Sequence, residues 1–242
     1  MYITIRFEDG YEIPAVVLDS RFYEALKGAV PIKSKTLTWK EEVYFETGIE
    51  FHGEEFSRVA SGSLAYWPPG KSLCLFAWAN QPYGPVNIVG WFLGPKHYVF
   101  EIDEDEEVEV EVFKPDLYSR EAVSLTEHLV SNGFYAAPRK WAGTESIAGA
   151  YAKHNFRVGF EVFIEDFGYI VESDPIYERD FTAIDEAVQL RMKRVVKSRV
   201  DTNEDGYVIL SEFVSKGQSL VEAVSQITKD YLKVVDILSL VG

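Results

Sequence analysis

The chain has little cysteine, little methionine and no long apolar segment. Its single cysteine, Cys74, excludes an intramolecular disulfide, and the apolar run around it predicts a buried thiol. No stretch reaches the roughly 18 apolar residues that a membrane span requires. The first six residues alternate like a strand and lack the apolar core of a secretion signal. We therefore expect a soluble, cytoplasmic protein that does not bind membranes.

Basic residues are also scarce. The 24 lysines and arginines face 39 aspartates and glutamates, which gives this acidic protein a formal net charge of -15. Such a charge repels phosphate backbones, so nucleic acid is not an expected partner. The four histidines show no repeated ligand spacing, and no phosphate-binding glycine loop or serine nucleophile motif occurs. Composition therefore names no reaction.

Short strands dominate the first half of the chain. Strands at residues 2–7 and 11–18 flank Asp9-Gly10, a pair that accepts the positive φ angles of a tight hairpin turn. A helix is predicted from Asp19 or Ser20 to Ala29, because the first two can cap it and Pro31 prevents its continuation. Further strands are predicted at residues 42–45, 64–67, 73–78, 86–92 and 108–113.

A boundary is expected at Lys114-Pro115-Asp116, where the apolar period changes from two to about 3.6. Residues 1–114 would form one domain, and residues 117–242 a smaller α+β domain. That second domain should contain helices at 119–131 and 182–200, a hairpin at 157–171 and a final helix that begins at Ser219. The apolar stripe of the final helix predicts a core face or, alternatively, a contact in a homo-oligomer.

Residues 201–212 fit the twelve-residue loop of a calcium-binding EF-hand. Six to eight oxygens surround calcium in proteins. The template assigns ligand oxygens to Asp201, Asn203, Asp205, the carbonyl of Tyr207 and both carboxylate oxygens of Glu212. With helices on both sides, the segment predicts an EF-hand-like helix-loop-helix and calcium as a cofactor.

An ordinary turn is the alternative for this segment. Asn-Glu-Asp-Gly sequences form turns because the same side chains hydrogen-bond to their own backbone. Ile209 stands at the ninth loop position, where the template needs an oxygen or a water ligand. The departure predicts weak calcium affinity.

Three segments of the first half resemble the small cyclophilin-like proteins of archaea and bacteria, a family known mainly as uncharacterised. They are Tyr66-Trp67-Pro68-Pro69-Gly70-Lys71-Ser72-Leu73-Cys74-Leu75-Phe76, Val86-Asn87-Ile88-Val89-Gly90 and residues 38–45. The resemblance covers roughly residues 1–114. It implies a closed antiparallel β-barrel with one or two short helices.

The resemblance does not imply prolyl isomerase activity. Cyclophilins that isomerise X-Pro bonds use an arginine to hydrogen-bond the proline nitrogen. Phe51-His52-Gly53 only partly matches the Phe-His-Arg motif and has glycine in place of that arginine. We therefore expect no useful isomerase activity.

A ligand groove on the barrel is the sharper functional hypothesis. Aromatic walls, a donor and an amide suit recognition of a small molecule or peptide. The candidate residues are Trp39, Tyr66, Trp67, Lys71 and Asn87. Alternatively, Trp39 and Trp67 simply fill the end of the barrel. The sequence thus predicts a binding protein, with an enzyme of unknown reaction that uses the same groove as the alternative.

Overall fold

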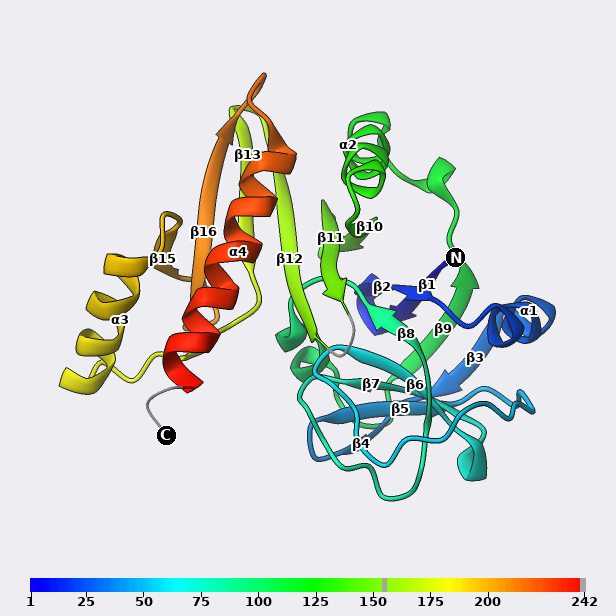
Figure 1. The fold of residues 1–242 in the computed structure, drawn as a ribbon. Helices are drawn as coiled ribbons and strands as arrows, with labels where there is room; N and C mark the ends of the chain where they lie inside the picture. Colours follow the sequence, from blue (N-terminus) through cyan, green and yellow to red (C-terminus); the bar gives the residue numbers. More distant parts are fainter. Residues whose placement is uncertain (154–155, 240–242) are drawn as a thin grey trace.

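A computed structural model of the protein describes residues 1–153 and 156–239, and these fold into two antiparallel sheets (Figure 1). The first sheet has nine strands in the order β3-β9-β1-β2-β8-β6-β7-β5-β4. Its strands are β1 (Tyr2–Phe7), β2 (Glu12–Val17), β3 (Ile32–Lys35), β4 (Leu37–Trp39), β5 (Glu42–Glu46), β6 (Ser63–Trp67), β7 (Ser72–Phe76), β8 (Asn87–Phe92) and β9 (Glu107–Val112).

The first sheet curls into a nearly closed barrel. Its two edge strands, β3 and β4, are consecutive in the chain, which brings the sheet back on itself. Apolar side chains at alternate positions of each strand fill the interior, as the period of two requires. Leu73, Leu75 and Val89 lie in this interior. A barrel leaves little free strand edge, which disfavours edge-to-edge association.

Local signals explain the N-terminal elements. β1 and β2 form the predicted hairpin, and Gly10 adopts a φ of 78° in the short 3-10 helix η1 (Glu8–Gly10) that joins them. Helix α1 (Ser20–Ala29) begins where the Asp19 carboxylate accepts hydrogen bonds from the backbone N–H groups of Arg21 and Phe22. Gly90 is required on β8, because a Cβ there would lie 1.9 Å from the Val16 carbonyl oxygen. The remaining 3-10 helices are η2 (Pro68–Gly70), η3 (Lys96–Glu101) and η4 (Pro115–Leu117).

The second sheet contains the strands after η4, in the order β10-β11-β12-β13-β16-β14, with β15 also paired to β16. Helices α2 and α4 cover one face of it, and their apolar side chains share one core with the sheet. The strands are β10 (Tyr135–Trp141), β11 (Thr144–Lys153), β12 (Phe156–Glu165), β13 (Gly168–Ser173), β14 (Tyr177–Glu178), β15 (Arg199–Thr202) and β16 (Tyr207–Ser215). The helices are α2 (Arg120–Ser131), α3 (Ala183–Val195) and α4 (Leu220–Ser239).

The apolar stripe of α4 is a core face. Leu220, Val224, Ile227, Tyr231 and Val234 are all buried within the chain. An oligomer that uses this helix would therefore need other side chains, and oligomerisation stays a prediction. Within the described ranges, no helix is long and apolar enough to span a membrane.

The EF-hand-like helix-loop-helix prediction is wrong. Helix α3 ends at Val195, and both arms of the predicted loop are strands, because β15 pairs with β16 in an antiparallel hairpin. The segment that follows the turn, Tyr-Val-Ile-Leu, is rich in β-branched and aromatic residues, which favour a pleated strand over an exiting helix. The polar Asn-Glu-Asp-Gly segment is the turn of this hairpin.

A buried ion pair joins the two sheets. Nη1 of Arg157 on β12 lies 3.3 Å from Oδ2 of Asp174, and neither side chain is more than 3% exposed. The same guanidinium donates to the carbonyls of Phe92 and Gly94, while Asp174 accepts from the backbone N–H of Lys96 at 2.7 Å. Both charged side chains are therefore paired with each other, and each also hydrogen-bonds to the backbone of the N-terminal half of the chain.

We predict that Asp174→Asn lowers the free energy of unfolding by about 3–5 kcal/mol, because it leaves the Arg157 charge buried without its counter-ion. Urea denaturation at neutral pH measures the change. Asp166→Asn, in the exposed β12–β13 turn, is the matched control and should change little. A loss below about 1 kcal/mol for Asp174→Asn would contradict this assignment.

Candidate functional site

The face of the second sheet opposite α2 and α4 borders a cleft of about 810 Å³. Its other wall comes from the N-terminal half, through β1, η1 and η3. Small residues on β10 and β11 (Ala137, Ala148 and Ala150) share the core of the first sheet, which lets the two sheets approach beside the cleft. The cleft is thus built by segments far apart in the sequence.

Carboxylates dominate the lining of this cleft. Within the described residues, only two of the nine lie within 4 Å of a basic side chain: Glu161, beside Arg139, and Asp205, beside His97. The nine are Glu8, Glu101, Asp103, Glu106, Glu161, Glu165, Glu172, Glu204 and Asp205. The local field in the cleft is therefore strongly negative.

Arg139 lies at the floor of the cleft and is 1% exposed. Its guanidinium carbon lies 3.9 Å from the ring centre of Tyr98 and 4.5 Å from that of Tyr11, and its Nη1 lies 3.6 Å from Oε1 of Glu161. Some buried donors here have no hydrogen-bond partner among the described residues: Nε and Nη2 of Arg139, the Tyr98 hydroxyl and Nε1 of Trp141. Buried donors without partners cost free energy, so this floor favours an occupant that supplies acceptor oxygens.

Two carboxylates face each other across neighbouring strands of the cleft wall. Glu161 on β12 and Glu172 on β13 are direct register partners. Ser146 donates a hydrogen bond of 2.5 Å to Glu161, whereas no hydrogen bond to Glu172 is found among the described residues. Burial, and then the charge of Glu161, raise the pKa of Glu172 to about 7. Glu172 therefore carries a proton for part of the time at neutral pH.

We predict that Glu172→Gln stabilises the protein at about pH 8 by roughly 1–3 kcal/mol. A carboxyl whose pKa is raised on folding destabilises the folded state once it ionises. For Glu172 this loss of stability develops as the pH rises from the ordinary pKa of glutamate to about 7. The gain should therefore shrink as the pH falls below 7 and disappear below the ordinary glutamate pKa. Urea denaturation across this range measures it, with exposed Glu127→Gln on α2 as the control.

An equal gain at about pH 5 and about pH 8 would contradict a titrating Glu172. It would instead indicate a packing effect of the substitution.

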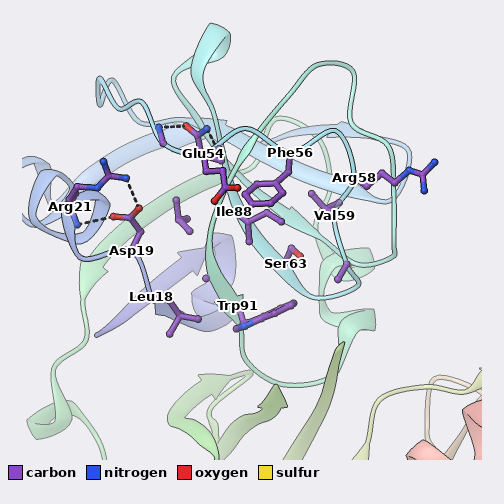
Figure 2. Close-up of a pocket in the computed structure, with 15 residues that line it drawn as sticks. Leu18, Asp19, Arg21, Glu54, Phe56, Arg58, Val59, Ser63, Ile88 and Trp91 are labelled. Atoms are coloured by element: carbon purple, nitrogen blue, oxygen red, sulfur yellow. Dashed lines mark hydrogen bonds and ion pairs between the residues drawn. The ribbon is translucent and has the colours of Figure 1, made fainter. Parts of the chain in front are cut away.

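A second pocket, of about 590 Å³, lies on the barrel beside α1, β8 and the loop of residues 53–60. Figure 2 shows Phe56, Val59 and Ile88 close together, with Ser63 and Trp91 below them in this view. Three of its polar side chains already have partners: Asp19 caps α1 and pairs with Arg21 at 3.1 Å, and Asn87 hydrogen-bonds to the backbone of residues 53 and 54. The Ser63 hydroxyl is the buried polar atom without one among the described lining residues.

The five residues of the predicted barrel groove do not share one pocket. Trp39 and Trp67 line a common hollow of about 200 Å³. Asn87 lines the pocket of Figure 2, where its amide accepts from the Gly53 N–H at 3.1 Å and donates to the Glu54 carbonyl at 3.0 Å.

The other two members of the predicted groove lie elsewhere. Tyr66 is in the barrel core, and its hydroxyl donates to the Ile49 carbonyl. Lys71 lies in the turn after η2, with Nζ 2.7 Å from Oε1 of Glu50. Of the five, the two tryptophans therefore share a pocket, and Tyr66 and Asn87 are register partners on β6 and β8 without sharing one.

The predicted calcium ligands do not converge on one point, although Asn203 Nδ2 donates a hydrogen bond of 3.2 Å to Asp205 Oδ2. The Tyr207 carbonyl accepts from the Asn203 N–H at 2.9 Å, and Asn203 Oδ1 accepts from the Tyr207 N–H at 2.8 Å, so both oxygens hold the turn. Asp201 pairs with Arg199 at 2.5 Å. Asp201 is the register partner of Ile209, so these two side chains point to the same face of the sheet. Glu212, the register partner of Val171, follows Ile209 by three residues and therefore points to the opposite face from Asp201. In the described ranges no three His, Cys, Asp or Glu side chains gather as a metal site.

Calcium binding itself stays a prediction, without the EF-hand geometry that first suggested it. Instead, the Asn203-Glu204-Asp205 turn borders the acidic cleft, where Asp205 Oδ2 lies 3.4 Å from Nε2 of His97.

Comparison with known proteins gives a family for the N-terminal half. The family model described as cyclophilin-like matches residues 1–111. Residues 1–111 are therefore similar to the cyclophilin-like family. One similar solved chain is the solution structure of the hypothetical protein AF2241 from Archaeoglobus fulgidus, with 29% identity and a TM-score of 0.40; the match covers 47% of the present chain and 95% of that one. No curated protein matches the chain.

Proposed function

We propose that the protein binds a short peptide segment rich in lysine or arginine in the cleft between its two sheets. The supporting observation is the lining of nine carboxylates, of which Glu161 alone pairs with an arginine among the described residues. The volume of the cleft, about 810 Å³, lies within the roughly 300–1,000 Å³ that is usual for ligand pockets. The acidic cleft thus takes the place of the groove for a small molecule or peptide that the sequence predicted on the barrel.

Charge determines the class of ligand. A cleft that carries one sign of charge raises the local concentration of the opposite ion and steers it inward. Lysine or arginine side chains would also relieve the repulsion between Glu161 and Glu172 across β12 and β13. An anionic ligand would add to that repulsion.

A peptide suits the floor better than a simple amine does. The unpartnered donors of Arg139 and Tyr98 need acceptor oxygens, which the carbonyl groups of a peptide supply and a protonated amine lacks. Aromatic rings of Phe7, Tyr11 and Phe163 line the same cleft, and such rings pack against the stems of long basic side chains.

An enzyme remains the second candidate function, favoured by Glu172. A carboxyl with a pKa of about 7 can accept or donate a proton at neutral pH, as general acid–base catalysis requires. No reaction follows from the present arrangement.

Titration calorimetry with trilysine, and with the neutral triglutamine as matched peptide, tests the proposal. Trilysine should bind and triglutamine should not. Binding of a cation beside Glu172 lowers its pKa, so the complex should release protons near pH 7. The apparent enthalpy should then differ between two buffers of different ionisation enthalpy. At about 100 times Kd, trilysine would stabilise the fold by about 2.7 kcal/mol.

Two variants separate this site from general attraction to an acidic protein. Glu172→Gln should abolish proton release and weaken trilysine binding, whereas Glu127→Gln should leave both unchanged. Equal binding of trilysine and triglutamine, or an effect reproduced by sodium chloride at matched ionic strength, would refute the proposal.

A further inference from the structure

A small aromatic hollow lies on the outer face of the barrel, separate from the acidic cleft. Its volume is about 200 Å³, below the roughly 300–1,000 Å³ that drug-sized ligands occupy. The lining comes from β4, β5, the end of β6 and the loop after β7. Its residues are Trp39, Glu42, Tyr44, Trp67, Pro82, Tyr83 and Val86.

Strand register brings these side chains to one face. Trp39 on β4 is the register partner of Glu42 on β5. Tyr44 follows Glu42 by two residues and therefore points to the same side, whereas Val43 and Phe45 point into the barrel core. Trp67 packs beside Tyr44 from β6. The hollow thus rests on a rigid part of the sheet.

Four aromatic rings form its walls in two perpendicular pairs. The ring centres of Tyr44 and Trp67 are 6.3 Å apart at 87°, and those of Trp39 and Tyr83 are 6.5 Å apart at 86°. Tyr83 is 86% exposed although it borders the hollow. A ligand between the rings would bury exposed surface of Tyr83, which otherwise has the edge-to-face contact with Trp39.

A carboxylate completes the lining. Glu42 is 8% exposed, and among the described residues no basic side chain lies within 4 Å of it. Burial raises its pKa to about 7, with the thiol of Cys74, a weak donor, opposing this shift. A buried carboxylate without a counter-ion is costly, so the hollow favours a cation beside Glu42.

We propose that this hollow binds a quaternary or methylated ammonium head group. Such a cation is attracted by the faces of tryptophan and tyrosine, and its methyl groups need no hydrogen-bond acceptor. A bare ammonium would require acceptors for its N–H groups, and Glu42 is the single carboxylate in the lining. A compact trimethylammonium group suits both the size and the chemistry.

A neighbouring contact supports the role of Trp39. Nζ of Lys40 lies 4.2 Å from the centre of the Trp39 ring, although Lys40 does not line the hollow. The electron-rich ring of Trp39 therefore already attracts a cation from within the chain. The proposal does not depend on the peptide proposed for the acidic cleft, since the two sites have no lining residue in common.

Choline and its uncharged isostere 3,3-dimethyl-1-butanol form a matched pair for the test. Titration calorimetry at about pH 8 keeps Glu42 ionised, because its pKa is about 7. Choline should bind at least about tenfold more tightly than the isostere, because the two differ only in charge. Equal affinity would overturn the proposal, and so would no binding of choline at millimolar concentration.

Variants assign the binding to the hollow. Glu42→Gln and Trp67→Leu should each weaken choline binding by about tenfold. Glu41→Gln removes the same charge one residue away, outside the hollow, and should leave the affinity unchanged. Circular dichroism establishes that each variant folds. Unchanged choline affinity in a folded Glu42→Gln variant would overturn the site.

The head group could belong to a free metabolite or to a modified protein side chain. Nε-trimethyllysine in a blocked amino acid, compared with choline and with unmethylated blocked lysine, separates these sources. Tighter binding of trimethyllysine would identify a protein-borne group, and tighter binding of choline a free one. Preference for unmethylated lysine over both would refute recognition of methylated ammonium.

Discussion

The buried Arg157–Asp174 pair is the interaction on which the arrangement of the two sheets depends. Its hydrogen bonds reach the carbonyls of Phe92 and Gly94 and the N–H of Lys96, all at the junction of β8 and η3. Glycines make room for it: a Cβ on Gly62 would lie 2.2 Å from Arg157 Cδ, and one on Gly159 would lie 2.6 Å from Asp174 Oδ1. Since a buried charge needs such pairing, the pair fixes how β12 packs against the junction of β8 and η3, and residues of η3 line the acidic cleft.

The excess of acidic over basic residues is reflected in the lining of both sites. Strand alternation places the carboxylates of β12 and β13 on the cleft face, while the apolar residues between them pack under α2 and α4. On the barrel, the same alternation places Glu42 among aromatic rings. Sheet register holds Glu161, Glu165 and Glu172 in the cleft and Glu42 in the hollow, and among the described residues no lysine lies within 4 Å of any of these four carboxylates. The fold thus gathers acidic side chains in both sites, which is why we propose cationic ligands for each.

Sequence patterns predicted the turns and helix starts that depend on neighbouring residues. They did not predict the sites that distant segments of the chain form together. Asp9-Gly10 and the cap at Asp19 identify their elements because the signals are contained within a few residues. The EF-hand template failed because it records oxygen-bearing residues without testing whether Tyr-Val-Ile-Leu favours a helix or a strand. Alternation could have shown that adjacent Tyr66 and Trp67 point to opposite faces. No local pattern marks Arg139 or Glu172, because their environment is made by strands and loops far apart in the chain.

The contact between Asp205 and His97 has a consequence for how the molecule unfolds. Asp205 belongs to the β15–β16 turn and His97 to η3, so each half of the chain contributes a wall of the same cleft. An occupant that touches both walls gains affinity only while the two halves stay together. Its binding free energy would then add to their mutual stability, and two partly independent melting events would merge into one cooperative transition.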